Sequence, residues 1–192
     1  MKKYILGIDQ GTTGTRAIIF DQDVNIISSA YSEFTQYFPQ PGWVEHDAME
    51  IYEITLKMMR QAISEAHLKP ENIAGIGITN QRETTVFWDK NTGIPADRAI
   101  VWQDRRTLPI CEALIEKDGP AIEDRTGVTI IPNDSATKIH WQLKNNPEIR
   151  RGVDEGRLIY GTIDSWLTWK LSGGRAHVTD PSNSAVTLLQ NA

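Results

Sequence analysis

The first third of the chain alternates short apolar runs with turn residues, a pattern typical of β-strands. Tyr4 to Ile8 is an almost continuous apolar run that ends at Asp9, and we expect a strand buried on both faces. Residues 17–20 and 24–30 predict two more strands, because a Gly/Thr turn at 11–15 and a hairpin loop at 21–23 separate them. The chain therefore opens as strand, turn, strand, turn, strand.

The next segment of the chain has the periodicity of an amphipathic helix. Apolar residues at steps of four and three predict a helix with one apolar stripe made of Tyr52, Leu56, Met59, Ile63 and Ala66, and Pro70 ends that segment. Further strands are expected at 73–78, 84–88 and 100–102, a short apolar segment at 158–160, and helices at 107–117, 135–143 and 162–171. We expect the helix at 135–143 to extend by one or two turns. Strands that alternate with helices predict an α/β domain.

Length and composition restrict the class of protein. The 192 residues suit one large domain or a tight pair, and we predict a single domain over residues 1–192. A net charge of −5 argues against a general nucleic-acid binder, which needs a basic face. No apolar run reaches the about 18 residues of a membrane span. The run at 4–8 is shorter than the ~7–15 residues of a signal-peptide core, so we expect a cytoplasmic protein.

The first candidate for chemistry is the segment from Asp9 to Arg16. A carboxylate at a strand end is followed by small residues whose backbone N–H groups and hydroxyls can converge on a phosphate: Thr12, Thr13 and Gly14. Asp9 can hold a Mg²⁺ ion, and Arg16 adds positive charge. An ordinary hairpin with Ser/Thr turn residues fits the same pattern.

A second candidate joins Arg82 and Glu83 to Trp102. The Arg82 guanidinium donates hydrogen bonds and the Glu83 carboxylate accepts them, so the adjacent pair can bracket a vicinal diol. Trp102 can form an apolar wall for the C–H face of a polyol. A solvated polar turn and a core tryptophan are the alternatives.

Other reactive residue types lack a supporting pattern. The four histidines have no metal-ligand spacing, and we expect structural or exposed roles for His46, His67, His140 and His177. The single cysteine, Cys111, lies in a helical apolar pattern, which is typical of an inert buried thiol. A lone cysteine also excludes a disulfide scaffold.

Six stretches together resemble the FGGY family of carbohydrate kinases, and within it the branch that phosphorylates glycerol. They are GIDQGTTGTR at 7–16, PGWVEHD at 41–47, TNQRETTV at 79–86, AIVWQDRRT at 99–107, GTIDSWLTWK at 161–170 and HVTD at 177–180. They span nearly the whole chain, so the resemblance is far more specific than any one stretch.

The resemblance implies a fold and a reaction. The fold is a ribonuclease-H-like, actin-like ATPase domain, with a mixed sheet and flanking helices, that forms the first of two domains around an active-site cleft. The implied reaction is ATP-dependent phosphorylation of a small polyol or sugar, most simply glycerol to glycerol 3-phosphate, with ATP and Mg²⁺ as cofactors. The complete enzyme is expected to be a homo-oligomer.

The same resemblance implies residue roles. Asp9 is similar to the family's Mg²⁺-linked catalytic acid. Arg82 and Glu83 match the pair that grips the polyol hydroxyls, and Trp102 matches an aromatic wall. The positions that fall near the nucleotide phosphates are Thr12, Thr13, Gly14 and Arg16. The family's catalytic base and second domain lie beyond residue 192, so we expect this chain to be a fragment or a truncated gene product that is inactive alone.

The chain departs from the glycerol branch just before Ser135-Ala-Thr-Lys138. That branch usually has Tyr-Phe there, whereas this chain has Asn133 and Asp134, so Asn133 replaces a tyrosine that helps to hold the polyol. Gln142 also replaces an apolar residue. These changes leave another polyol or a ketose open as substrate.

Two other functions stay open. One is a non-catalytic polyol-binding or regulatory fragment that kept the fold and lost the chemistry. The other is a ribonuclease-H-type nuclease, which needs several convergent carboxylates on two metals, whereas only Asp9 stands at an obvious strand end.

Overall fold

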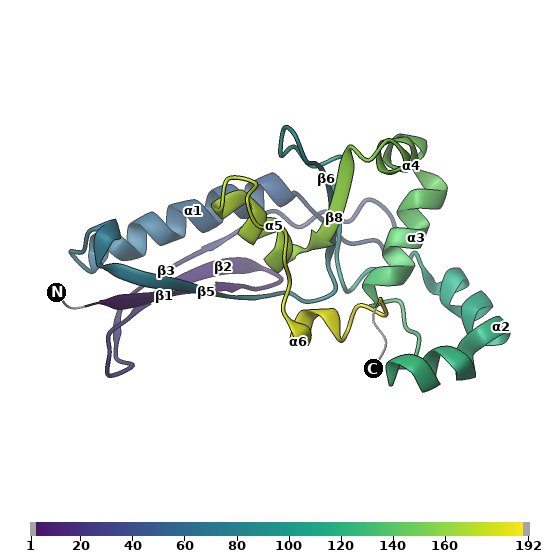
Figure 1. Cartoon of the computed structure of the whole chain (residues 1–192), viewed down its shortest axis with the longest axis horizontal. Helices are drawn as coiled ribbons and strands as arrows, with labels where there is room; N and C mark the ends of the chain where they lie inside the picture. Colours follow the sequence, from purple (N-terminus) through teal and green to yellow (C-terminus); the bar gives the residue numbers. More distant parts are fainter. Residues whose placement is uncertain (1–2, 190–192) are drawn as a thin grey trace. The chain divides into compact units, whose positions relative to one another are not determined.

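The computed structural model describes residues 3–189, which form two compact units (Figure 1). Unit 1 runs up to Thr35 and resumes over Met49–Gln81, and unit 2 comprises Gln36–Ala48 and the chain from Arg82 onward. Each unit has its own four-stranded sheet. No helix within residues 3–189 has the length and hydropathy needed to cross a membrane.

Unit 1 is built on a mixed sheet with the strand order β3-β2-β1-β5. β1 pairs antiparallel with β2, β2 pairs antiparallel with β3, and β5 runs parallel to β1. The elements are β1 (Tyr4–Gln10), β2 (Gly14–Phe20), β3 (Ile26–Glu33), α1 (Ala48–Glu65), the 3₁₀ turn Pro70–Asn72 and β5 (Ile73–Asn80). The predicted opening of three strands, the first helix and the strand after Pro70 are confirmed.

The expectation that β1 is buried on both faces is wrong. Leu6 and Ile8 are buried, whereas Ile5 is 46% exposed and Asp9 is exposed. One face of the sheet is covered by α1, because Ser28, on the same face as Leu6, donates a hydrogen bond to the Ala62 carbonyl of that helix at 2.7 Å. An apolar run cannot reveal by itself that only one of its faces is covered.

The apolar stripe predicted for α1 is also displaced. The predicted stripe is half-buried, whereas α1 fully buries the side chains of Ala48, Ile51, Thr55, Met58 and Ala62. A search for apolar residues overlooks Thr55 as a buried position. Its hydroxyl donates to the Ile51 carbonyl at 2.8 Å and is therefore satisfied in the interior.

Unit 2 is built on an antiparallel sheet with the strand order β4-β7-β6-β8. Its strands are β4 (Glu45–His46), β6 (Thr85–Asp89), β7 (Ala99–Ile100) and β8 (Leu158–Thr162). Its helices are α2 (Leu108–Thr126), α3 (Ser135–Asn145), α4 (Pro147–Asp154), α5 (Ile163–Leu171) and α6 (Pro181–Ser184). Phe87, Ile139, Ile149 and Leu158 form one core cluster, and the rings of Trp88 and Trp166 meet edge to face at 5.3 Å.

Three helices differ from the prediction. α2 continues through Pro120 to Thr126, beyond the predicted end at 117. α4 is a separate helix rather than an extension of α3, since the Asn146 side chain accepts the N–H groups of residues 148 and 149 and Pro147 takes the first helical position. The Asp180 side chain caps the short helix α6 in the same way. The dipeptides Asn-Pro and Asp-Pro are therefore helix start signals that the sequence analysis did not use.

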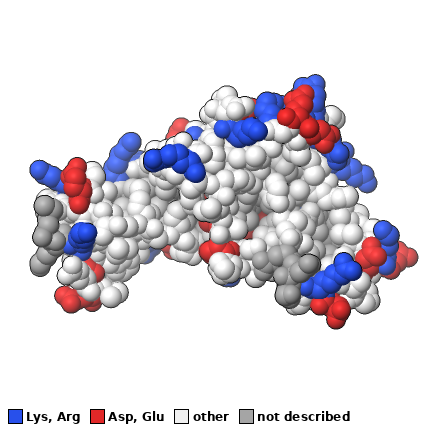
Figure 2. All heavy atoms as spheres, viewed as in Figure 1, with Lys and Arg blue, Asp and Glu red and all other residues white. Residues whose placement is uncertain are grey.

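The surface of α4 carries charges of both signs (Figure 2). Arg150 pairs with Asp154 at 2.9 Å, and Arg151 lies within 3.9 Å of Glu155. Exposed pairs of this kind contribute little stability, so α4 is held chiefly by Ile149, which is buried in the core cluster.

Candidate functional site

In unit 1, the predicted phosphate turn is the tight link between β1 and β2. The Gly11 N–H donates to the Gly14 carbonyl at 2.9 Å and closes the turn. Thr13 is exposed and Thr12 is half-buried. Gly14 is buried, and a Cβ there would lie 2.7 Å from the backbone carbonyl oxygen of Ser32, so the position requires a residue without a side chain.

Asp9 and Arg16 stand opposite each other beside this turn. They are directly paired across β1 and β2, so both side chains lie on the same face of the sheet, and both are exposed. The Arg16 guanidinium lies 5.4 Å from the centroid of the Tyr31 ring on β3. An exposed carboxylate of this kind fits Mg²⁺, which prefers one or two carboxylates together with phosphate oxygens and waters.

Two glutamines that the sequence analysis missed hold the base of the turn. Gln10 and Gln81 are buried, and the Gln81 side-chain amide donates to the Gln10 Oε1 at 3.1 Å and to the Gly11 carbonyl at 3.3 Å. The Gln81 N–H donates to the Gln10 carbonyl at 2.8 Å. Each glutamine is next to a residue that was singled out, Asp9 or Arg82, but nothing in the sequence reveals that they pair across 71 positions.

In unit 2, Arg82 and Glu83 form the turn that leads into β6. Arg82 is exposed and Glu83 is half-buried, with a φ of 69° that is unusual for a residue with a side chain. Burial raises the pKa of the Glu83 carboxyl, and Lys138 opposes the rise. The turn therefore offers an exposed donor beside a partly desolvated acceptor.

Trp102 follows β7 on a second loop. Its backbone N–H donates to the Thr84 hydroxyl at 3.2 Å, which connects this loop to the Glu83 turn. Trp102 is half-buried, and its role as an apolar wall stays a prediction.

A buried guanidinium fixes the loop that carries Trp102. The Arg106 side chain is 3% exposed and makes hydrogen bonds of 2.8 and 3.0 Å with the buried Asp104 carboxylate. It also bonds Glu45 at 2.8 Å. Its guanidinium carbon lies 3.6 Å from the ring centroid of Trp43 and 4.9 Å from that of Trp141.

A buried ammonium organises the third loop, which carries Asn133. Lys138 on α3 is 0% exposed, and its Nζ donates to the carbonyls of Pro132 at 2.8 Å, of Asp134 at 3.3 Å, and of Asn133. Burial lowers the pKa of Lys138 to about 8, against the opposing effect of Glu83 and other acidic groups. The Ser135 hydroxyl then donates to the Glu83 carbonyl at 3.0 Å and joins this loop to the Glu83 turn.

Two of the departures from the glycerol branch, Asn133 and Asp134, lie in this loop, and the third, Gln142, is buried on α3. Asn133 is half-buried. Asp134 is 1% exposed; its Oδ2 accepts the Ile131 N–H at 2.9 Å, and its Oδ1 has no hydrogen-bond partner within the described chain. Burial raises the pKa of the Asp134 carboxyl. The chain thus buries a carboxylate where the family resemblance leads us to expect a phenylalanine.

The predicted site residues therefore form two groups. Arg82, Glu83, Trp102 and Asn133 lie on three loops of unit 2 that the Thr84 and Ser135 hydroxyls connect. At one end of the β1–β2 pair in unit 1 lie Asp9, Thr12, Thr13, Gly14 and Arg16. Cys111 is buried as expected, and burial raises the pKa of its thiol.

Comparison with known proteins identifies relatives of the whole chain. The profile of the FGGY family of carbohydrate kinases, N-terminal domain, matches residues 4–192. Glycerol kinase 2 of Thermotoga maritima is 53% identical over 190 residues, and glycerol kinase of Bacillus thuringiensis is 55% identical over 192 residues. These matches cover 98% and 100% of this chain but only 38% and 39% of the relatives.

Solved structures show the same fold. The crystal structure of Plasmodium falciparum glycerol kinase with ADP superposes with a TM-score of 0.92 at 36% identity, over 99% of this chain and 38% of that one. The ligand-bound xylulose kinase of Lactobacillus acidophilus gives a TM-score of 0.86 at 20% identity, over 98% of this chain and 37% of that one, and shares the fold. The predicted actin-like α/β fold is confirmed.

We expect Arg106→Lys to destabilise the protein by about 2 kcal/mol, because lysine keeps the charge but loses the planar fork and the stacking on the Trp43 ring. Arg105→Lys is the matched control: Arg105 is exposed, and its replacement should change the free energy of unfolding by less than about 0.5 kcal/mol. Urea denaturation followed by tryptophan fluorescence measures both. Equal stability of the two variants would contradict the role assigned to Arg106.

Proposed function

The chain belongs to the FGGY family of carbohydrate kinases, and from this premise we propose that it is the N-terminal domain of an ATP-dependent glycerol kinase. The turn formed by Arg82 and Glu83 is the observation that carries the proposal. An exposed guanidinium beside a partly desolvated carboxylate supplies donor and acceptor at adjacent positions, which suits the neighbouring hydroxyls of a polyol. Identities of 53–56% to glycerol kinases across the chain support glycerol as the substrate.

We propose that Trp102 and Asn133 complete the polyol pocket of unit 2. The half-buried indole covers the C–H face of the substrate, and Asn133 lies on the loop that Ser135 and Lys138 hold next to Glu83. Binding of this kind orients one primary hydroxyl for attack on a phosphoryl group and excludes water from its surroundings.

The nucleotide side of the proposal rests on the β1–β2 turn. Thr12, Thr13 and the Gly14 backbone contact the phosphates of ATP, Arg16 adds positive charge, and Asp9 holds Mg²⁺ directly or through water. When bound, Mg²⁺ neutralises charge on the transferring phosphoryl group. The ADP named in the Plasmodium falciparum structure supports a nucleotide cofactor.

The chain spans about 38% of the length of its curated relatives, so the complete activity is part of the proposal. We propose that residues 1–192 form one FGGY-type domain and that the catalytic base and the second domain belong to the rest of a longer protein. The family resemblance further implies a cytoplasmic homo-oligomer.

A second candidate substrate is a longer polyol or a ketose. Asn133 favours it, because a side chain shorter than tyrosine leaves space beside the bound substrate. This alternative changes the pocket of unit 2 and leaves the phosphoryl-transfer residues as proposed.

The variant Asp9→Asn tests the phosphoryl-transfer role in the full-length protein. We expect kcat to fall by about two orders of magnitude or more with little change in the Michaelis constant for glycerol, because a metal-linked carboxylate acts on charge that develops in the transition state. A coupled assay for ADP release measures both constants. A variant that raised only the Michaelis constant for the polyol would make Asp9 a substrate ligand, and the proposed assignment would be wrong.

The variant Asn133→Tyr tests the substrate. We expect kcat/KM for glycerol to rise about two- to tenfold relative to that for xylitol, because a tyrosine fills the space and adds one hydrogen-bonding group. The ratio of the two kcat/KM values, before and after the change, is the measurement. An unchanged ratio would show that Asn133 does not line the pocket.

A further inference from the structure

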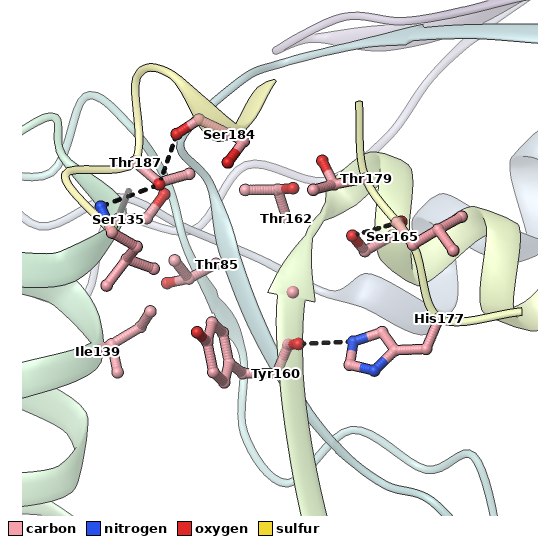
Figure 3. Close-up of a pocket in the computed structure, with 13 residues that line it drawn as sticks. Thr85, Ser135, Ile139, Tyr160, Thr162, Ser165, His177, Thr179, Ser184 and Thr187 are labelled. Carbon is pink, nitrogen blue, oxygen red and sulfur yellow. Dashed lines mark hydrogen bonds between the residues drawn. The ribbon is translucent and has the colours of Figure 1, made fainter. Parts of the chain in front are cut away.

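The polar side chains around the cavity of unit 2 serve the fold itself. This cavity of about 340 Å³ lies beside β8 and α3 (Figure 3). The hydroxyls of Ser135, Ser165 and Thr187 line it, and each donates its proton to a backbone carbonyl of the protein. The Gln10–Gln81 pair of unit 1 is different, because its amides bond the backbone of the turn that is assigned to the phosphates of ATP.

Both glutamines occupy places where a sheet usually buries apolar side chains. Gln10 ends β1 on the same face as the buried Leu6 and Ile8 and is 0% exposed. Gln81 directly follows β5 and is 5% exposed. Burial of an amide is unfavourable unless its donors and acceptor are hydrogen-bonded, so the partners of the pair indicate what it holds in place.

The hydrogen bonds of the pair converge on the Gly11 carbonyl. Gln10 Nε2 donates to this oxygen at 2.8 Å, and Gln81 Nε2 donates to it at 3.3 Å. Gln81 Nε2 also donates to Gln10 Oε1 at 3.1 Å, so each amide fixes the other. A carbonyl oxygen has two lone pairs, and the two glutamines together occupy both of them.

A fixed carbonyl also fixes the N–H group of the next residue. The peptide group is planar and trans, so its C=O and N–H bonds point in opposite directions. Because the Gly11 carbonyl points toward two buried amides, the Thr12 N–H points away from them and from the base of the turn. Rotation of this peptide would place a carbonyl oxygen, which repels phosphate, where the N–H group now lies.

We propose that Gln81 is a positioning residue for the nucleotide. Together with Gln10, its amide holds the Gly11–Thr12 peptide in the orientation that presents the Thr12 N–H to a phosphate group. The inference rests on the proposed function, which assigns this turn to the phosphates of ATP. It adds a buried residue that acts through the turn rather than by contact with the nucleotide.

Calorimetric titration of the full-length protein with MgADP tests this role. Gln81→Met keeps the length of the side chain and removes its donors, so it should weaken MgADP binding about tenfold or more. The affinity for glycerol, measured in the same way, should change by less than about twofold, because the lost bonds lie in the nucleotide turn. Gln61→Met is the matched control: Gln61 is exposed on α1, where it bonds Glu65, and its replacement should leave both affinities unchanged.

A double-mutant cycle shows whether the two glutamines act as one unit. Gln10→Met removes the other donor to the Gly11 carbonyl and should weaken MgADP binding as Gln81→Met does. The double variant should bind MgADP within about twofold of either single variant, because residues that share one network are not additive. The melting temperature of each variant shows whether it folds, and Gln10→Met provides the comparison if Gln81→Met does not.

The outcomes separate this inference from the kinase proposal. Unchanged MgADP binding in the folded variants overturns the positioning role and leaves the kinase proposal intact. Equal weakening of MgADP and glycerol binding also overturns it, because that pattern indicates a general loss of structure. Selective weakening of MgADP binding supports the role even in a protein that phosphorylates no polyol, whereas a wild-type protein that binds no MgADP contradicts both proposals.

Discussion

The candidate substrate pocket depends on one buried cation, the Lys138 ammonium. It has no exposed surface, and it holds the carbonyls of three consecutive residues, 132–134, so that the loop carrying Asn133 wraps around it. Removing an ammonium group from water is costly, and these carbonyls together with the nearby Glu83 and Asp134 carboxylates offset that cost. The next residue after the loop, Ser135, donates a hydrogen bond to the Glu83 carbonyl, so the same cation indirectly positions the Arg82–Glu83 turn.

Arg106 fixes the loop that carries Trp102, as Lys138 fixes the loop that carries Asn133. Its guanidinium is enclosed by the Asp104 carboxylate and two indole rings, and Asp104 in turn accepts the Val44 N–H at 2.7 Å. Candidate binding residues therefore sit on loops, while buried cations and hydrogen bonds to backbone carbonyls make those loops rigid. This arrangement leaves the side chain of Asn133 open to substitution, because Lys138 bonds only the backbone carbonyl of that residue.

The sequence predicted what local pattern and short motifs determine. The strands of the N-terminal meander, the fold class, and the turns that carry Asp9 and Glu83 all follow from apolar runs and adjacent residues. Burial of only one face of β1 and the Gln10–Gln81 pair were not predictable in that way, because they arise from contacts between segments far apart in the chain. Lys138 was visible as part of Ser-Ala-Thr-Lys, yet its burial shows only when α3 and the preceding loop are folded.

Titration of Lys138 by NMR tests this account most directly. In the full-length protein labelled with ¹³C-lysine, the side-chain resonance of Lys138, assigned by its loss in Lys138→Arg, can be followed from pH 6 to pH 11. Because burial disfavours the charged form, the account predicts a pKa of about 8 for Lys138. A pKa near the ordinary lysine value of about 10.4 would show a solvated side chain and would contradict the account.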